Sequence, residues 1–165
     1  MTVRIAVDTN VLLSGIIWPR WPYAILQHAL QGDVELVLPE VVLLEARRHI
    51  RRDFPDEAER FERFLTLVNF ESTPLPSADE VESASGLVRQ IEDIPVALAV
   101  IAAKVDYFVT YDRDFTDDHP STAAVRAAIP GIRLPPIFLR DVMGWSSEQL
   151  EAIRYRTWDD MVAAE

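Results

Sequence analysis

Short runs of β-branched and aliphatic residues alternate along the chain with longer stretches that keep apolar residues at helical spacing. Such apolar runs, each closed by a turn residue or an acid, are typical of buried strands. Strands are predicted over residues 3–7, 34–38, 107–110 and 132–134, the last at an edge of the sheet. Residues 71–77 contain Pro74 and Pro76, which predict a linker or an irregular edge strand.

The stretches between the strands predict helices. They are expected over residues 11–17, 23–31, 39–53, 56–67, 78–90, 94–103, 123–128 and 146–155, with a further helical region that begins at Pro135. Thr9 and Asn10 offer side chains that could cap the first helix. Residues 94–103 are apolar nearly all round, so this helix is expected to be deeply buried. The polar residues 114–119 predict a loop.

Strands that alternate with helices predict an α/β fold with βαβ units, a mostly parallel central sheet and a three-layer α/β/α arrangement. The chain contains no internal repeat and no low-complexity segment. We therefore expect a single domain over residues 1–165, with a core at about 3–140 and a helical C-terminal tail at 141–165. Ligands of such open sheets bind beyond the carboxyl ends of the strands, near the point where strand order reverses.

Composition narrows the class of protein. With 165 residues, 49% hydrophobic and 26% charged, the chain is long enough for one real core. It contains no cysteine, which excludes disulfides, thiolate catalysis and cysteine-based metal sites. The three histidines are far apart and do not form a zincin motif. No signal peptide and no apolar run of about 20 residues is present, so a cytoplasmic protein without membrane contact is expected.

The formal net charge of −11 argues against indiscriminate binding to nucleic acid, which depends on a basic surface. Local positive charge exists at Arg47, Arg48, Arg51 and Arg52. These arginines cover several sides of one predicted helix, so a solvated basic face is the better interpretation for most of them.

Four acidic residues lie either just after predicted strands or within helix-forming stretches. Asp8 and Asp112 close two predicted strands, while Glu45 and Asp93 belong to helix-forming stretches. If the fold brings them together, their like charges raise one another's pKa. A divalent cation would remove that conflict, and two such cations would form a centre that cleaves phosphodiesters.

Each acid also has a structural interpretation. Asp8 could cap a helix or close a turn, and Asp93 could be an N-cap. Glu45 could pair with Arg48 or His49 at helical spacing.

The segment Thr110–Asp114 offers two carboxylates. Residues separated by one position would point to opposite sides if the strand continued. We therefore interpret Asp112 as the closer residue and Asp114 as a supporting or substrate-side residue. The Thr110 hydroxyl could orient a carboxylate or a water molecule. Glu40, Asp106 and Asp117 are interpreted as bystanders.

Other motifs are weak or missing. Residues 112–123 resemble an EF-hand loop only in part, because glycine is missing at the sixth loop position and Ala123 replaces the final glutamate. The chain has no GxSxG, P-loop or GxGxxG motif, which removes the usual hydrolase, NTPase and dinucleotide-binding interpretations.

Taken in order and spacing, the acidic segments resemble those of PIN-domain ribonucleases, especially the VapC-like toxins of bacterial toxin–antitoxin pairs. The resemblance runs from Val3 to about Leu139 and is carried by residues 7–12, 39–45, 93–99, 107–115 and 131–135. It implies that Asp8, Glu45, Asp93 and Asp112 form a catalytic quartet that binds Mg²⁺ or Mn²⁺. Asn10 and Thr110 fall on accessory polar positions of the family.

The resemblance further implies a three-layer PIN-like domain that cleaves RNA endonucleolytically. It suggests the toxin of a type II toxin–antitoxin pair, with RNA as substrate, an antitoxin protein as a possible partner, and a homodimer. Three features depart from the family pattern: Tyr111 stands where a small or polar residue is common, the net charge is strongly acidic, and a tail follows Asp141. The rival interpretation is a PIN-fold module that binds RNA or protein without cleaving, which the acidic charge favours.

Overall fold

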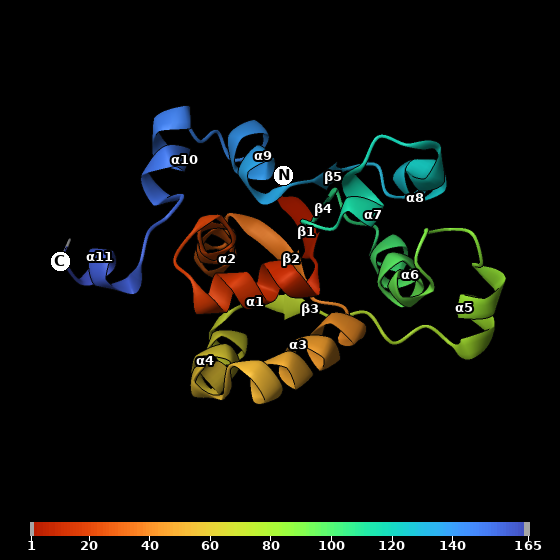
Figure 1. Ribbon diagram of the computed structural model, residues 1–165, viewed down its shortest axis with the longest axis horizontal. Helices are drawn as coiled ribbons and strands as arrows, with labels where there is room; N and C mark the ends of the chain where they lie inside the picture. Colours follow the sequence, from red (N-terminus) through yellow and green to blue (C-terminus); the bar gives the residue numbers. More distant parts are fainter. Residues whose placement is uncertain (1, 164–165) are drawn as a thin grey trace.

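Five short strands form one central sheet in the computed structural model, which describes residues 2–163 (Figure 1). The strands are β1 (Val3–Val7), β2 (Val34–Val37), β3 (Phe70–Glu71), β4 (Tyr107–Val109) and β5 (Ile132–Arg133). Their order is β3-β2-β1-β4-β5, and every neighbouring pair is parallel. The predicted parallel sheet is therefore confirmed.

The strand order reverses at the centre of this sheet. From β1 the chain builds outward through β2 to β3, and then returns to place β4 on the other side of β1. Val7 of β1 lies opposite Val109 of β4, so both strands end at the same level. Asp8 and Thr110, the next residue of each strand, therefore lie side by side at the switch point.

Helices flank the sheet on both sides, which gives the predicted three-layer α/β/α arrangement (Figure 1). They are α1 (Thr9–Ile17), α2 (Trp21–Gln31), α3 (Glu40–Asp53), α4 (Ala58–Leu67), α5 (Ala78–Ser83), α6 (Ile94–Ala103), α7 (Arg113–Thr116), α8 (Ala123–Ala128), α9 (Pro135–Asp141), α10 (Ser147–Ile153) and α11 (Trp158–Ala163). Three 3₁₀ turns, η1 (Pro55–Glu57), η2 (Ile91–Asp93) and η3 (Pro120–Thr122), precede α4, α6 and α8.

The core is built on the two central strands. Val7, Phe108 and Val109 are completely buried, and α6 contributes Ala97 and Val100, which are buried as predicted. Burying each large aliphatic or aromatic side chain contributes about 1.5–3 kcal/mol. The ends of β1 and β4 thus lie in the fully buried core.

The helix predicted over 78–90 is wrong beyond Ser83. Ser77 and Glu80 form a capping box that starts α5, but residues 84–90 make turns instead of continuing the helix. Gly86 has φ +89°, a value outside the helical region, and Val88 is the one buried residue of this segment. With so little apolar surface to bury, packing does not stabilise a longer helix.

The loop predicted over 114–119 is partly wrong, because α7 begins at Arg113. Phe115 is buried and packs edge-on against Phe108, with ring centroids 5.1 Å apart. This aromatic contact holds a short helical turn against the end of β4. Asp112 is therefore presented from the N-terminus of α7.

Other differences concern boundaries. Helix α1 begins at Thr9 and is capped by Asp8, and α2 begins at Trp21 with Pro22 in its tolerant first turn. Strand β3 precedes the proline-containing segment, and α11 falls within the predicted helical tail, where no separate helix was delimited beyond residue 155. The remaining strands and helices agree with the predictions to within a few residues at each end.

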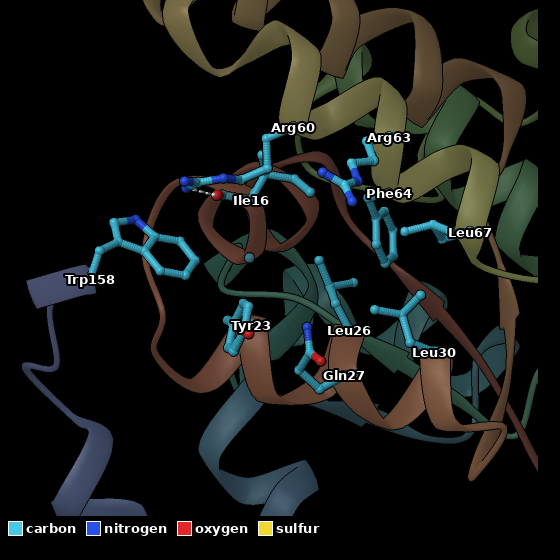
Figure 2. Close-up of a pocket in the computed structure, with 11 residues that line it drawn as sticks. Ile16, Tyr23, Leu26, Gln27, Leu30, Arg60, Arg63, Phe64, Leu67 and Trp158 are labelled. Carbon is cyan, nitrogen blue, oxygen red and sulfur yellow. Dashed lines mark hydrogen bonds between the residues drawn. The ribbon is translucent and has the colours of Figure 1, made fainter. Parts of the chain in front are cut away.

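The chain beyond α9 crosses α2 and ends against α1 and α4. Trp158 of α11 donates a hydrogen bond from Nε1 to the Ile17 carbonyl at 2.8 Å. The Arg60 guanidinium lies 4.2 Å from the Trp158 ring centroid, and both side chains are drawn in Figure 2. Next to Trp158 lies an apolar cleft of about 150 Å³, whose walls include Leu26 and Phe64. The division into core and tail stays a prediction, and residues 1 and 164–165 lie outside the described part. Across residues 2–163, no helix is long and apolar enough to cross a membrane.

Candidate metal centre

Asp8 closes β1 and caps α1 at the same time. Its Oδ1 accepts a hydrogen bond from the Thr9 amide, and its Oδ2 accepts one from the Thr110 hydroxyl, both at 2.8 Å. Burial raises the pKa of Asp8 to about 6; these two hydrogen bonds oppose the rise, and the charges of Asp112 and Glu45 add to it. Asp8 therefore does cap α1, but this role does not explain why other acids lie close to it.

Thr110 connects the two central strands through its side chain. It is completely buried, and its hydroxyl donates to Asp8 Oδ2 while accepting from the Asp112 amide at 2.9 Å. The Asp112 carboxylate accepts in turn from the Asp114 amide at 2.9 Å. A single hydroxyl thus holds the Asp8 carboxylate and the backbone of Asp112, as expected of a residue that supports metal ligands.

Three carboxylates converge beside this pair. Asp93, Asp112 and Asp114 each offer one oxygen, and these oxygens all lie within 4.8 Å of one another. Asp93 stands at the N-terminus of α6, yet its side chain makes no capping hydrogen bond. Capping therefore does not account for Asp93. Asp114, interpreted from sequence as a supporting residue, lies in this triad together with Asp112.

The three carboxylates of the triad repel one another when they are ionised. Burial, a hydrogen bond with Asp114 and the charges of the neighbouring aspartates Asp112, Asp114 and Asp8 together raise the pKa of Asp93 to about 8. A carboxyl group with such a pKa keeps its proton at neutral pH unless a positive charge arrives. A hard divalent cation, which prefers carboxylate oxygens, would supply that charge.

Glu45 lies outside the triad, on the side of α3 that faces α1. Its Oε2 accepts a hydrogen bond from the Thr9 hydroxyl at 2.8 Å. Among residues 2–163, no ion pair joins Glu45 to Arg48 or His49, so the structure does not support the local-pair interpretation. The charge of Glu45 contributes to the raised pKa of Asp8, so Glu45 lies at the edge of the same acidic site.

The remaining predicted residues lie at the rim. Asn10 is exposed on the first turn of α1, beside Asp8. Tyr111 is 39% exposed between the two strand-end residues Thr110 and Asp112, and burial of the rest raises the pKa of its hydroxyl to about 12. Arg47 and Arg52 are engaged with Glu62 and Asp53, which agrees with a solvated basic face.

Two residues that touch the site were not predicted from sequence. Thr9 bonds Asp8 through its amide and Glu45 through its hydroxyl, and Arg89 binds Asp114 from the turn before α6. In the sequence, Thr9 is distinguished only as a capping residue. Arg89 carried no signal, because it fell inside a stretch that was predicted to be helical.

Comparison with known proteins agrees with this geometry. A PIN domain family model matches residues 4–114, a range that contains Asp8, Glu45, Asp93, Asp112 and Asp114. A search of the curated proteins found no match.

Two solved structures are similar in fold. The crystal structure of PAE2754 from Pyrobaculum aerophilum has a TM-score of 0.57 and 17% sequence identity, and the alignment covers 88% of this chain and 98% of that chain. The crystal structure of VapBC2 from Rickettsia felis, bound to a DNA fragment from its promoter, contains a chain with a TM-score of 0.54 and 15% identity. That alignment covers 79% of this chain and 98% of the other. At such low identity, these likenesses show a shared fold.

Proposed function

The chain belongs to the PIN-domain family, and we propose that it is an endoribonuclease that uses Mg²⁺ or Mn²⁺ to hydrolyse RNA phosphodiester bonds. PIN domains are generally nucleases. The observation that carries the proposal is the convergence of Asp93, Asp112 and Asp114 beside Asp8 at the switch point of the sheet. Phosphodiester hydrolysis at neutral pH is the chemistry that such a carboxylate centre supports.

The proposed roles follow from the contacts of each side chain. Asp93 and Asp112 would hold the cation with Asp8, whose orientation is fixed by Thr110. Asp114 would hold or support it from the other side, and Glu45 would complete the acidic set through Thr9. Asn10 would contribute at the exposed rim. When bound, the cation would lower the pKa of a coordinated water and stabilise negative charge on the phosphate.

One carboxylate of the set must also accept the proton of the attacking water. Asp8 suits this role, because hydrogen bonds from the Thr9 amide and the Thr110 hydroxyl hold both of its oxygens in place. The Tyr111 ring, exposed beside Asp112, would contact a base of the RNA strand.

The biological role that we propose is the toxin of a type II toxin–antitoxin pair, which acts on cytoplasmic RNA and forms a homodimer. The similarity in fold to a chain of VapBC2 and the sequence resemblance to VapC-like toxins support this role. An antitoxin protein would then be its partner. The net charge of −11 favours the rival function, a PIN-fold module that binds RNA or protein without cleaving it.

A cleavage assay separates the two functions. Purified protein is incubated with a mixed pool of end-labelled RNA in Mn²⁺, in Mg²⁺ and in EDTA, beside Asp93→Asn. Asp118→Asn is the matched control, because this fully exposed aspartate belongs to the loop after α7 and lies outside the acidic set. Cleavage by the wild type and the control, lost in EDTA and in Asp93→Asn, is expected. Cleavage that persists in EDTA or in Asp93→Asn would contradict the metal-dependent mechanism, and no cleavage at all would favour the binding module.

A further inference from the structure

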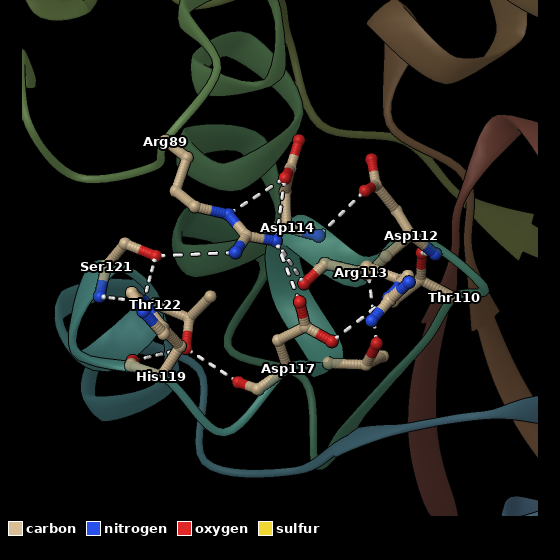
Figure 3. A network of polar contacts seen from close by, with 10 residues as sticks. Arg89, Thr110, Asp112, Arg113, Asp114, Asp117, His119, Ser121 and Thr122 are labelled. Atoms are coloured by element: carbon tan, nitrogen blue, oxygen red, sulfur yellow. Dashed lines mark hydrogen bonds and ion pairs between the residues drawn. The ribbon is translucent and has the colours of Figure 1, made fainter.

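Arg89 makes more polar contacts around the acidic site than any single acid does. Its Nε lies 2.9 Å from Asp114 Oδ1, and its Nη2 donates to the Arg113 carbonyl at 2.8 Å and to Asp117 Oδ2 at 3.2 Å. Its Nη1 reaches Ser121 Oγ at 3.4 Å. Figure 3 shows this fan of contacts from one guanidinium to the segment 113–121. All three guanidinium nitrogens make polar contacts within the protein, so Arg89 is not free to bind a substrate.

These contacts connect two segments that each carry part of the triad. Arg89 lies four residues before Asp93, in the turn segment 84–90. Its acceptors lie 24 to 32 residues further along the chain, around α7, which presents Asp112 and Asp114. Val88 is the one fully buried side chain of the turn segment, and Ala84 and Leu87 pack against the core only partly buried, so apolar packing fixes this segment less firmly than the strand ends. The arginine is therefore the principal polar link between the Asp93 side and the Asp112–Asp114 side of the centre.

We propose that Arg89 is a positioning residue, a clamp that sets the spacing between Asp93 and the Asp112–Asp114 pair so that a divalent cation meets preorganised oxygens. This inference rests on the proposed function of the same centre. A guanidinium suits the role, because its planar fork can satisfy several acceptors at once and keeps its charge at any physiological pH.

The clamp has an electrostatic cost that makes the proposal falsifiable. A fixed positive charge beside Asp114 and Asp117 repels an incoming cation, so on charge alone the removal of Arg89 would tighten metal binding. Loss of preorganisation acts in the opposite direction. Replacement of residues that orient metal ligands typically weakens metal affinity by about 10–100-fold. The proposal therefore predicts that the geometric effect outweighs the charge effect.

Two substitutions at Arg89 and one control separate these effects. Arg89→Ala removes both charge and clamp, while Arg89→Lys keeps the charge but cannot reach all four acceptors. Arg113→Ala is the matched control. Arg113 also pairs with Asp117, at 3.3 Å, but its side chain is 84% exposed and it bonds no other side chain in the described structure. It therefore changes the net charge near the site by the same amount without removing a clamp.

The measurement is Mn²⁺ affinity by isothermal titration calorimetry, with folding checked by circular dichroism and thermal melting in EDTA. A loss of about 10-fold or more is expected for Arg89→Ala, a loss of at least several-fold for Arg89→Lys, and a change within about twofold for Arg113→Ala. The Mn²⁺ concentration for half-maximal RNA cleavage should rise in parallel, with the KM for RNA nearly unchanged. If Arg89→Ala does not fold, Arg89→Lys decides the matter.

Arg89 variants that bind Mn²⁺ as tightly as the wild type, or more tightly, would overturn the clamp. A loss in Arg113→Ala as large as that in Arg89→Ala would do the same, because it would reduce the effect to charge. A wild type that binds Mn²⁺ but cleaves no RNA would contradict the proposed function alone, and the clamp would still be judged from the binding constants. A wild type that binds no Mn²⁺ would overturn both.

Discussion

The two sides of the acidic centre are built by different means. On one side, Asp8 and Thr110 directly follow two completely buried strand ends, and a single buried hydroxyl ties them together. On the other side, Asp93 follows a turn segment with little apolar packing and is connected to Asp114 through Arg89 and a shared hydrogen bond. The strand side is fixed by the core, whereas the loop side is fixed by polar contacts. A cation bound between them would link the strand side to the loop side.

Asp112 belongs to both sides, so its replacement should have the largest effect. It receives a hydrogen bond from Asp114, its amide donates to Thr110, and it contributes an oxygen to the triad. Asp112→Asn should lower RNA cleavage by about 1,000-fold, since a lost metal ligand removes several kcal/mol of transition-state stabilisation. Single-turnover cleavage rates check this. A loss below about tenfold would show that the two sides act without a common ligand.

The strand side should respond to Thr110→Val mainly through stability. This change leaves Asp8 Oδ2 and the Asp112 amide without their partner at a completely buried position. The free energy of unfolding should fall by about 1–3 kcal/mol in urea denaturation, with cleavage reduced as well. Thr110→Ser keeps the hydroxyl and should recover most of both. Equal stability of the valine and serine variants would contradict the role of the hydroxyl.

The loop side should control the pH dependence of the metal-free protein. The pKa of Asp93 is raised to about 8 and that of Asp8 to about 6, so the folded protein keeps protons that the unfolded chain releases near pH 4. Their contribution to stability is full below that pH and is lost as pH rises through about 6 for Asp8 and about 8 for Asp93. In EDTA, the melting temperature of the wild type should therefore fall between pH 6 and 8.5.

Asp93→Asn tests which side is responsible. This variant cannot lose the proton in question, so its melting temperature should be flatter than that of the wild type between pH 6 and 8.5. Asp8→Asn should flatten the curve mainly below about pH 6.5. Parallel curves for the wild type and Asp93→Asn would show that the loop side carries no such proton. With saturating Mn²⁺, the wild-type slope should shrink, because the cation displaces the protons.

The smallest effect on the site is expected from the far end of the molecule. Trp158→Ala removes a hydrogen bond to the Ile17 carbonyl and a cation–π contact with Arg60. It should cost about 1–3 kcal/mol of stability. Mn²⁺ affinity should stay within about twofold of the wild type. A larger change in affinity would mean that the tail is coupled to the metal centre, which neither half of the site requires.

The same contrast explains what the sequence could predict. Asp8 and Asp112 were identified because each follows an apolar run, and a run that ends in an acid is a local signal. The parallel sheet and the buried α6 followed from periodicity in the same way. Asp93 was identified as well, although the absence of its capping hydrogen bond required coordinates.

The rest depended on contacts between distant segments. Arg89 acts on residues at least 24 positions away, and no periodicity marks such a partner. Residues 84–90 have helix-forming composition, yet they bury too little to remain helical. The triad position of Asp114 depends on the helical turn of α7, which Phe115 fixes by packing on Phe108. Strand-side features are therefore readable from sequence, and loop-side features require the fold.

An anomalous difference map from a crystal soaked in Mn²⁺ would show whether the acidic cluster binds metal, because it locates the ion independently of any activity. We expect a peak at the carboxyl ends of β1 and β4, within coordination distance of Asp93 and Asp112 and beside Asp8. Arg89 should remain bound to Asp114 in the same crystal. A map with no peak there at millimolar Mn²⁺, or with its strongest peak elsewhere on the protein, would contradict the assignment of this acidic cluster as a metal centre.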